Sequence, residues 1–171
     1  NFVNCDFSNS VLYHTSFSFA TVKACSFNKS VINAPYYNLI ASYICECDFR
    51  GATVRLSDEI SEAPSWIVDC DFTGANIPVS GEGGDELTLI PNLVNSNFTA
   101  SNLKSPVFWG LLTGCKFYDA VFEGTENFGA VSHLTGTSFL GATGLTSAKL
   151  DVQTAVLRRS GAIWTDGSSL Q

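Results

Sequence analysis

FVNCDFSNSVLYHTSFSFATVKACSFNKSVI, residues 2–32, repeats one simple pattern every five positions. A large apolar side chain stands at each fifth position, and from residue 5 onward a small side chain stands two places before it. The large side chains are Phe2, Phe7, Leu12, Phe17, Val22, Phe27 and Ile32. Neither an α-helix nor a plain strand alternation has a five-residue period. A short extended segment followed by a corner does, because residues i−2 and i then point to the same side.

A second, longer period of about twenty residues indicates that four such segments close one coil of a solenoid. It is carried by a column of phenylalanines: Phe7, Phe27, Phe49, Phe72, Phe98, Phe117 and Phe139. The next side repeats it with Leu12, Ile32, Val54, Ile77, Leu103 and Phe122. The sequence therefore predicts an all-β solenoid of seven to eight coils, in which each coil packs only on its neighbours.

Three short motifs give this pattern a family resemblance: CDFRGA at 47–52, CDFTGA at 70–75 and SFLGA at 138–142. They resemble the signature of the pentapeptide repeat family, and the resemblance covers residues 1–145. It implies that family's fold, a right-handed quadrilateral β-helix. Gly51, Gly74 and Gly141 are then expected at corners, where a residue without Cβ turns most cheaply.

Residues 146–171 are expected to close the solenoid. The stretch DVQTAVLRR, residues 151–159, predicts a short capping helix that ends at Gly161. This segment is similar to the closing segment of cyanobacterial-type pentapeptide proteins, although Lys149 departs from the acidic or amide residue often found there. The other end has no cap in the sequence, because Phe2 is already in register. Either further residues precede Asn1, the alternative we favour, or this end stacks on a partner.

Insertions are expected near residues 57–62, 80–91 and 124–131, where the spacing exceeds twenty. Residues 46–86 hold ten of the sixteen acids but only two of the nine basic residues. The first two insertions follow equivalent core positions, so their acids should form one lobe: Asp58, Glu59, Glu62, Glu82, Asp85 and Glu86. This lobe is either a solvated loop or a docking patch for a basic partner.

A second candidate surface is aromatic. Tyr36, Tyr37 and Tyr43 lie where the five-residue register slips, and Trp109 lies near a weakly patterned side. Aromatic side chains displaced outward would suit a protein interface.

Catalysis and cofactor binding are not expected. The two histidines, His14 and His133, are far apart, and the familiar nucleophile, phosphate-loop, dinucleotide and zinc motifs are absent from the sequence. Five cysteines fall in the small-residue column and should be buried reduced thiols, although stacked positions also approach disulfide distance. Cys45 lies outside that column, so it is the candidate for a reactive thiol. The net charge of −7 argues against direct contact with nucleic acid, and no apolar stretch is long enough to span a membrane.

The function expected from these features is a non-enzymatic interaction module, an accessory or assembly subunit that docks on a larger protein complex. The closing-segment resemblance implies a photosynthetic membrane complex as host and a thylakoid-lumen or periplasm-like compartment, with the cytoplasm as the alternative. The alternative function is a DNA-mimicking inhibitor or protector of a topoisomerase, from resemblance to the quinolone-resistance pentapeptide proteins. The uneven distribution of charge favours the first.

Overall fold

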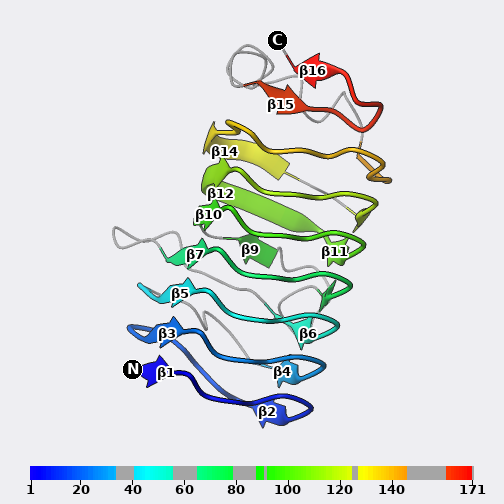
Figure 1. Ribbon diagram of the computed structural model, residues 1–171. Helices are drawn as coiled ribbons and strands as arrows, with labels where there is room; N and C mark the ends of the chain where they lie inside the picture. The colour runs from blue at the N-terminus through cyan, green and yellow to red at the C-terminus, as the bar shows by residue number, and fades with distance from the viewer. Residues whose placement is uncertain are drawn as a thin grey trace.

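Short parallel strands stacked in two main sheets build the protein, as the computed structural model in Figure 1 shows. The structure describes residues 1–33, 41–55, 65–78, 88–90, 92–124, 127–145 and 161–170. The first sheet runs in the order β1 (Phe2–Val3), β3 (Thr21–Lys23), β5 (Tyr43–Cys45), β7 (Trp66–Val68), β10 (Asn92–Val94), β12 (Pro106–Thr113) and β14 (Asn127–His133), and β9 (Thr88–Ile90) pairs with β12. The second contains β2 (Val11–Tyr13), β4 (Val31–Asn33), β6 (Thr53–Val54), β8 (Asn76–Ile77), β11 (Asn102–Lys104) and β13 (Val121–Glu123).

The strand register follows the columns that the sequence predicts. In the second sheet Leu12 pairs with Ile32, and Leu103 pairs with both Ile77 and Phe122. All of these pairs are parallel, because every coil runs in the same sense as the coil below it. The prediction of an all-β solenoid is therefore confirmed. The right-handed sense and the count of seven to eight complete coils stay predictions, since the connections between several stacked strands lie outside the described residues.

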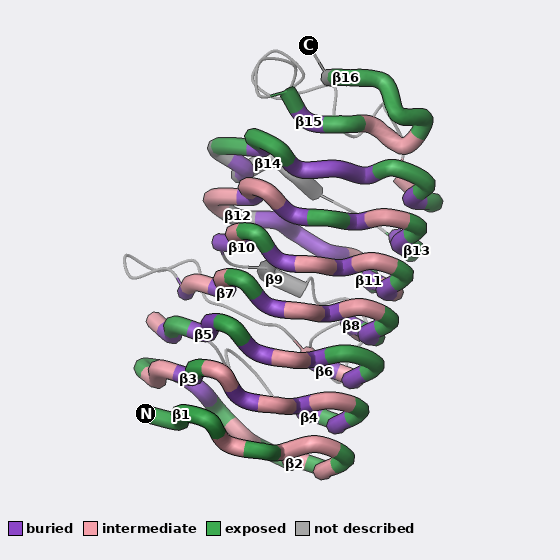
Figure 2. The backbone as a smooth tube through the Cα atoms, viewed as in Figure 1, coloured by how far each residue is buried: buried purple, intermediate pink, exposed green. Residues whose placement is uncertain are grey.

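The phenylalanine column forms a ladder through the centre of the solenoid. Consecutive rings from Phe7 to Phe139 stack with centroids 4.6–5.1 Å apart and planes within 12° of parallel. From Phe27 onward these rings are at most 2% exposed. Backbone bonds bind the same coils together, as where the Phe72 N–H donates to the Asn97 carbonyl at 2.7 Å. Figure 2 shows buried segments recurring at similar places in successive coils, between intermediate and exposed ones.

The corners repeat a left-handed backbone conformation every five residues. Asn4, Asn9, His14, Phe19, Ala24 and Lys29 all have φ between 51° and 59°. Gly51, Gly74 and Gly141 have φ of 63°, 65° and 73°, which confirms their predicted place at corners. After each ladder phenylalanine the turn closes by a bond back to it, as from the Ala75 N–H to the Phe72 carbonyl at 2.9 Å.

Two later coils carry a long strand on the third side, which is the side of Phe17 in the first coil; the fourth side is the one built by β1, β3 and β5. β12 covers eight residues and β14 seven, and both run from the third side onto the fourth. Phe108 in β12 takes the place that Phe17 has in the first coil, because each ring meets a ladder phenylalanine edge-on at 5.7 Å. Residues 127–131, inside the expected third insertion, belong to β14, and residues 88–90, inside the second, form β9.

At the C-terminal end a further layer continues the column pattern. β15 (Ala162–Ile163) pairs antiparallel with β16 (Ser169–Leu170), and Ile163 also bridges to Ser138 in the coil below. Ala162 is fully buried, and the Trp164 ring lies 6.0 Å from Phe139 at the end of the ladder. The described residues contain no helix, and the capping helix predicted over 151–159 lies outside them.

Replacing one central rung of the ladder tests the packing directly. We expect Phe72→Ala to cost about 3–5 kcal/mol, because a fully buried aromatic leaves a cavity between two stacked rings. Urea denaturation followed by circular dichroism measures it. Leu140→Ala is the control, since Leu140 is 47% exposed and should lose little. Equal losses for the two variants would contradict the ladder.

Two glycines separate backbone strain from steric clash. A Cβ on Gly74 would meet no atom within 4 Å, so Gly74→Ala should cost only the left-handed conformation, about 1–2 kcal/mol. A Cβ on Gly144 would collide with the Phe122 carbonyl oxygen, so Gly144→Ala should lower the melting temperature considerably more. Thermal unfolding of the two variants in parallel is the measurement. A lower melting temperature for Gly74→Ala than for Gly144→Ala would show that Gly144 does not contact the Phe122 backbone.

Candidate functional site

The predicted acidic docking patch lies outside the described residues. This holds for all six of its members: Asp58, Glu59, Glu62, Glu82, Asp85 and Glu86. The structure describes the strands on either side of both insertions. Ile44 pairs with Ile67 and Ile67 with Leu93 across them, so the stacking register is unchanged. The described coils on either side of each insertion thus stay stacked on one another.

Other acids of the same segment have a structural role. Outward residues on the phenylalanine side form a ladder of isolated parallel bridges: Asp6, Ser26, Asp48, Asp71, Asn97, Lys116 and Ser138. The Asp71 Oδ1 atom accepts a bond from the Thr73 backbone N–H at 2.9 Å, and Asp48 Oδ1 accepts the equivalent bond from Arg50 at 3.0 Å. Sequence reasoning counted these two aspartates only as surface charge, whereas each fixes the start of a corner.

Asp48 and Arg50 also form an ion pair along this ladder. The Arg50 guanidinium contacts both carboxylate oxygens, at 2.9 Å and 2.6 Å. Its hydrogen bonds hold the pKa of Asp48 below its usual value, and hydrogen bonds from Ser8 likewise lower the pKa of Asp6. These carboxylates therefore remain ionised and engaged, which makes them poor candidates for proton transfer.

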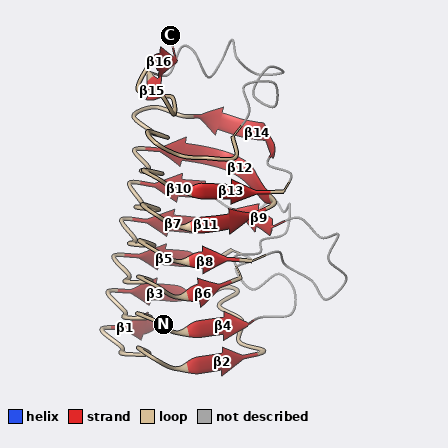
Figure 3. Ribbon diagram, turned by 90° about the vertical axis from the view of Figure 1, so that its right-hand side faces the viewer, coloured by secondary structure: helices blue, strands red, loops and turns tan. Residues whose placement is uncertain are grey.

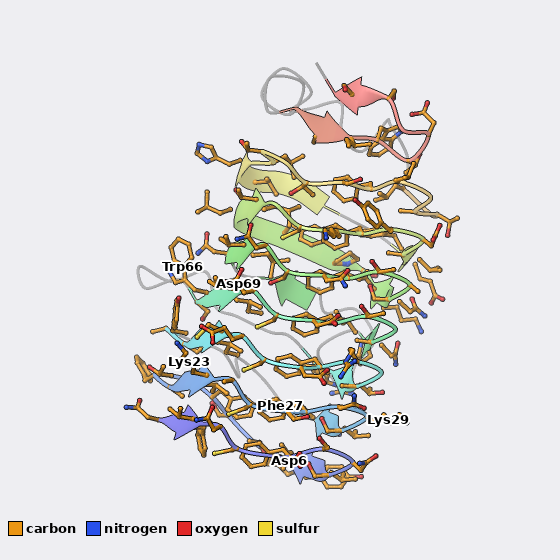
Figure 4. All side chains as sticks on the ribbon, in the orientation of Figure 1. Asp6, Lys23, Phe27, Lys29, Trp66 and Asp69 are labelled. Atoms are coloured by element: carbon orange, nitrogen blue, oxygen red, sulfur yellow. The ribbon has the colours of Figure 1, made fainter. Side chains whose placement is uncertain are left out.

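The candidate aromatic surface is placed only in part. Tyr36 and Tyr37 lie outside the described residues, as does the side chain of Trp109, whose backbone belongs to β12. Tyr43 is 44% exposed and pairs in register with Trp66 of the next strand. Figure 4 shows Trp66 pointing away from the solenoid on the same side as Lys23 and Asp69. Tyr43 and the half-buried Trp66 thus give two adjacent outward rings on the fourth side.

Cys45, the candidate for a reactive thiol if any cysteine is reactive, is buried. Cys45 is only 4% exposed although it lies outside the inward column, and burial raises the pKa of its thiol. The six cysteines are free thiols, and five of them are buried. Burial raises the pKa of Cys115 to about 12, so this thiol stays protonated at neutral pH. The column residues pack as small apolar groups rather than as nucleophiles.

The described residues offer no further candidate site among metal ligands, paired histidines or membrane-spanning helices. Within the described ranges no group of three or more His, Cys, Asp or Glu side chains could hold a metal ion. His14 and His133 are both exposed, on different coils. Across the same residues no helix is long and apolar enough to cross a membrane.

Sequence reasoning missed an exposed apolar surface on the first coils. Phe19 is 80% exposed, Tyr13 68%, Val11 54% and Val3 52%. Phe19 is also a bulky residue with φ of 59°, at a corner position that Asn9, Lys29 and Gly51 fill elsewhere. The five-residue pattern places Phe19 at a corner, but an outward position has no column of its own to mark it as exposed surface.

A family model described as pentapeptide repeats, with eight copies, matches residues 1–28. No curated protein matches the chain. Among solved structures it is similar to trypsin-treated QnrB1, a plasmid-mediated fluoroquinolone resistance protein, at 12% identity and a TM-score of 0.41, covering 82% of this chain and 70% of that one.

Two further solved structures are similar to the chain. A pentapeptide repeat protein of the Arabidopsis thaliana thylakoid lumen is 17% identical with a TM-score of 0.34, covering 99% of this chain and 83% of that one. HetL of the cyanobacterium Nostoc sp. strain PCC 7120, involved in regulating heterocyst differentiation, is 15% identical with a TM-score of 0.34, covering 96% and 76%.

Thiol labelling tests the placement of the cysteines. In dilute native protein we expect about one of the six thiols to react readily with a disulfide reagent, because only Cys5 is less than fully buried. In denaturant all six should react. Mass spectrometry of the labelled peptides identifies the site, and rapid native labelling of Cys45 would contradict the burial described above.

Proposed function

We propose that this chain belongs to the pentapeptide repeat protein family and is a non-enzymatic docking module, an accessory or assembly subunit of a larger protein complex. The observation that carries the proposal is the unchanged register across both insertions. Thr53 pairs with Asn76 across the first insertion, and Leu103 pairs with Ile77 across the second. A solenoid held by its inward columns can carry outward segments of varied sequence at no cost to the stack.

The expected partner surface is basic. The two insertions contain six acids and no basic residue within the ranges Ser57–Glu62 and Gly81–Glu86. Complementary charge of this kind speeds encounter and sets orientation more than it adds affinity. Tyr43 and Trp66, exposed and half-buried on the fourth side, supply the aromatic contacts that interfaces use.

We place the host complex at a photosynthetic membrane, on its lumenal side. This part of the proposal depends on the resemblance of the closing segment to cyanobacterial-type pentapeptide proteins. Fractionation of the source cells tests it independently of the docking function.

The alternative is a DNA-mimicking inhibitor of a topoisomerase. Duplex DNA carries one negative charge per about 1.7 Å of axis, evenly along its length. In the described residues the ladder on the phenylalanine side instead changes from Asp48 and Asp71 to Asn97 and then Lys116. The charge carried by that ladder therefore does not favour DNA mimicry.

A binding experiment with matched variants tests the docking function. The tagged chain is purified with cross-linked partners from its source, and the partners are identified by mass spectrometry. Changing Asp58, Glu59, Glu62 and Glu82 to Ser should weaken association with purified partner at least about tenfold at low salt, because the complementary charge is lost.

The control removes the same charge elsewhere, by Glu46→Gln, Asp69→Asn, Asp119→Asn and Glu123→Gln on exposed described residues. This variant should bind nearly as the parent does. Recovery of a topoisomerase as the main partner would overturn the docking proposal in favour of DNA mimicry. Equal weakening by both variants would show that net charge, and not the insertions, drives binding.

A further inference from the structure

The fourth side of the solenoid carries an uncharged outer surface over four consecutive coils. Figure 3 shows the strands of these coils, β5, β7, β10 and β12, one above another. Their inward residues are at most 2% exposed: Ile44, Ile67, Leu93 and Leu112. The residues on either side of each inward residue point outward. We call six of them the fourth-side face: Tyr43, Trp66, Val68, Val94, Leu111 and Thr113.

Charge distinguishes this face from two other sides of the same coils. Outward residues there include Asp48, Asp71 and Lys116 on the phenylalanine side, and Lys104 and Glu123 on the second sheet. The fourth-side face has no charged residue, and five of its six side chains are apolar or aromatic. Tyr43 is 44% exposed, and the other five are half-buried. Parallel strands that are apolar on both faces are usually covered on both, which indicates that this side lies against a partner.

Backbone pairing limits what can cover this face. Within the described sheet, β5, β7 and β10 each pair with a strand along both edges. Asn92 adds bonds between coils, because its side-chain N–H donates to the Ser65 carbonyl at 3.1 Å and its Oδ1 accepts from the Leu111 N–H at 2.8 Å. A partner strand therefore cannot add to these strands. The occupant must contact the face through side chains and satisfy its own backbone groups internally.

The residues at the two ends of the face set the length of the occupant. Lys23 lies beside Cys45 in the coil below and forms an ion pair with Glu46 at 3.1 Å, whereas His133 lies beside Leu111 in the coil above. Between them the four coils span about 14 Å, at about 4.8 Å per coil. An α-helix covers this length with about ten residues, and its turns, about 5.4 Å apart, nearly match the coils.

Two other occupants fit this face less well. Its outermost positions are about 14 Å by 7 Å apart. A stable pair of proteins buries roughly 800 Å² on each partner, so this face is too small to hold two copies of the chain together by itself. Glu46 and Asp69 are exposed at the adjoining corner, where an anionic lipid surface would repel them.

We propose that the fourth-side face binds an amphipathic α-helix of the partner protein, about ten residues long, with an uncharged apolar stripe on its contact side. The inference rests on the docking function proposed above and adds the element that the partner presents beside its basic surface. Successive turns of the helix lie over successive coils, and its apolar side chains pack between Trp66 and Leu111 on one side and Val68 and Val94 on the other. A charged residue within the stripe would be buried without a partner.

Fluorescence anisotropy with a defined peptide tests this site. The probe is a labelled synthetic peptide of about 14 residues, held helical by a covalent staple between residues four apart. It has leucines along one face and equal numbers of Lys and Glu on the other. It should bind the full chain with a dissociation constant between about 10 and 300 µM. A peptide of the same composition in scrambled order, which has no apolar stripe, should bind at least about tenfold more weakly.

Substitutions on two sides of the solenoid locate the contact. Val94→Asp should weaken binding of the helical probe at least about tenfold, because the helix would bury an unpaired charge. Val121→Asp is the matched control, since Val121 is an outward valine of the second sheet, 40% exposed, and this variant should bind as the parent does. Circular dichroism verifies the fold of both. If Val94→Asp is unfolded, Val94→Thr replaces it and should weaken binding about threefold, because its hydroxyl is buried.

The variant with Asp58, Glu59, Glu62 and Glu82 changed to Ser separates this inference from the docking function. It should bind the helical probe as the parent does, whatever its effect on association with the whole partner. The inference is overturned if the probe does not bind up to about 1 mM, if the scrambled peptide binds equally, or if Val121→Asp weakens binding as much as the fourth-side variant. Co-sedimentation with phosphatidylcholine vesicles, without binding of the probe, would instead assign the face to a lipid surface.

Discussion

Every other feature of this protein depends on the contact between one coil and the next. Two interactions of the same repeat coincide there: a ring stacked on a ring at 4.6–5.1 Å, and a backbone bond from each phenylalanine N–H to the carbonyl of the residue before the next phenylalanine. The ring spacing matches the separation of neighbouring strands, so neither interaction strains the other. A single coil could bury neither its phenylalanine nor its small inward residue. The stability of the protein therefore comes from the contacts between neighbouring coils.

The inward half of this structure was predictable, because its constraint is periodic. Phe27, Phe72 and Phe117 share a column in sequence and in space, and Gly74 takes the corner where the pattern put it. The burial of Cys45 was not predictable, since nothing in a five-residue period says what covers an outward position. The long strand β12 was missed for a related reason: Phe108 keeps the inward column, but the strand continues past the next corner position, Gly110, where φ is 87° and the pairing register shifts.

The same separation explains what the sequence reveals about function. The residues at inward positions are determined by packing in the core, and they recur with the repeat. The residues at outward positions are determined by what the surface binds, so they follow no period by which the sequence would identify them. Asp71 is an example: the sequence suggests a surface charge, but its carboxylate accepts a hydrogen bond from the Thr73 backbone N–H at the adjacent corner. The acids of the two insertions have no such position in the repeat, which is why the docking proposal depends on them.

Hydrogen exchange of individual backbone amides, measured by NMR, tests the stacking of coils most directly. The Phe27, Phe49, Phe72, Phe98 and Phe117 amides each donate to the following coil at 2.6–2.8 Å. If coil stacking holds the protein together, these amides exchange slowest, and their protection recurs once per coil and declines toward the first coil. Rapid exchange at these five amides, with protection concentrated elsewhere, would contradict the account.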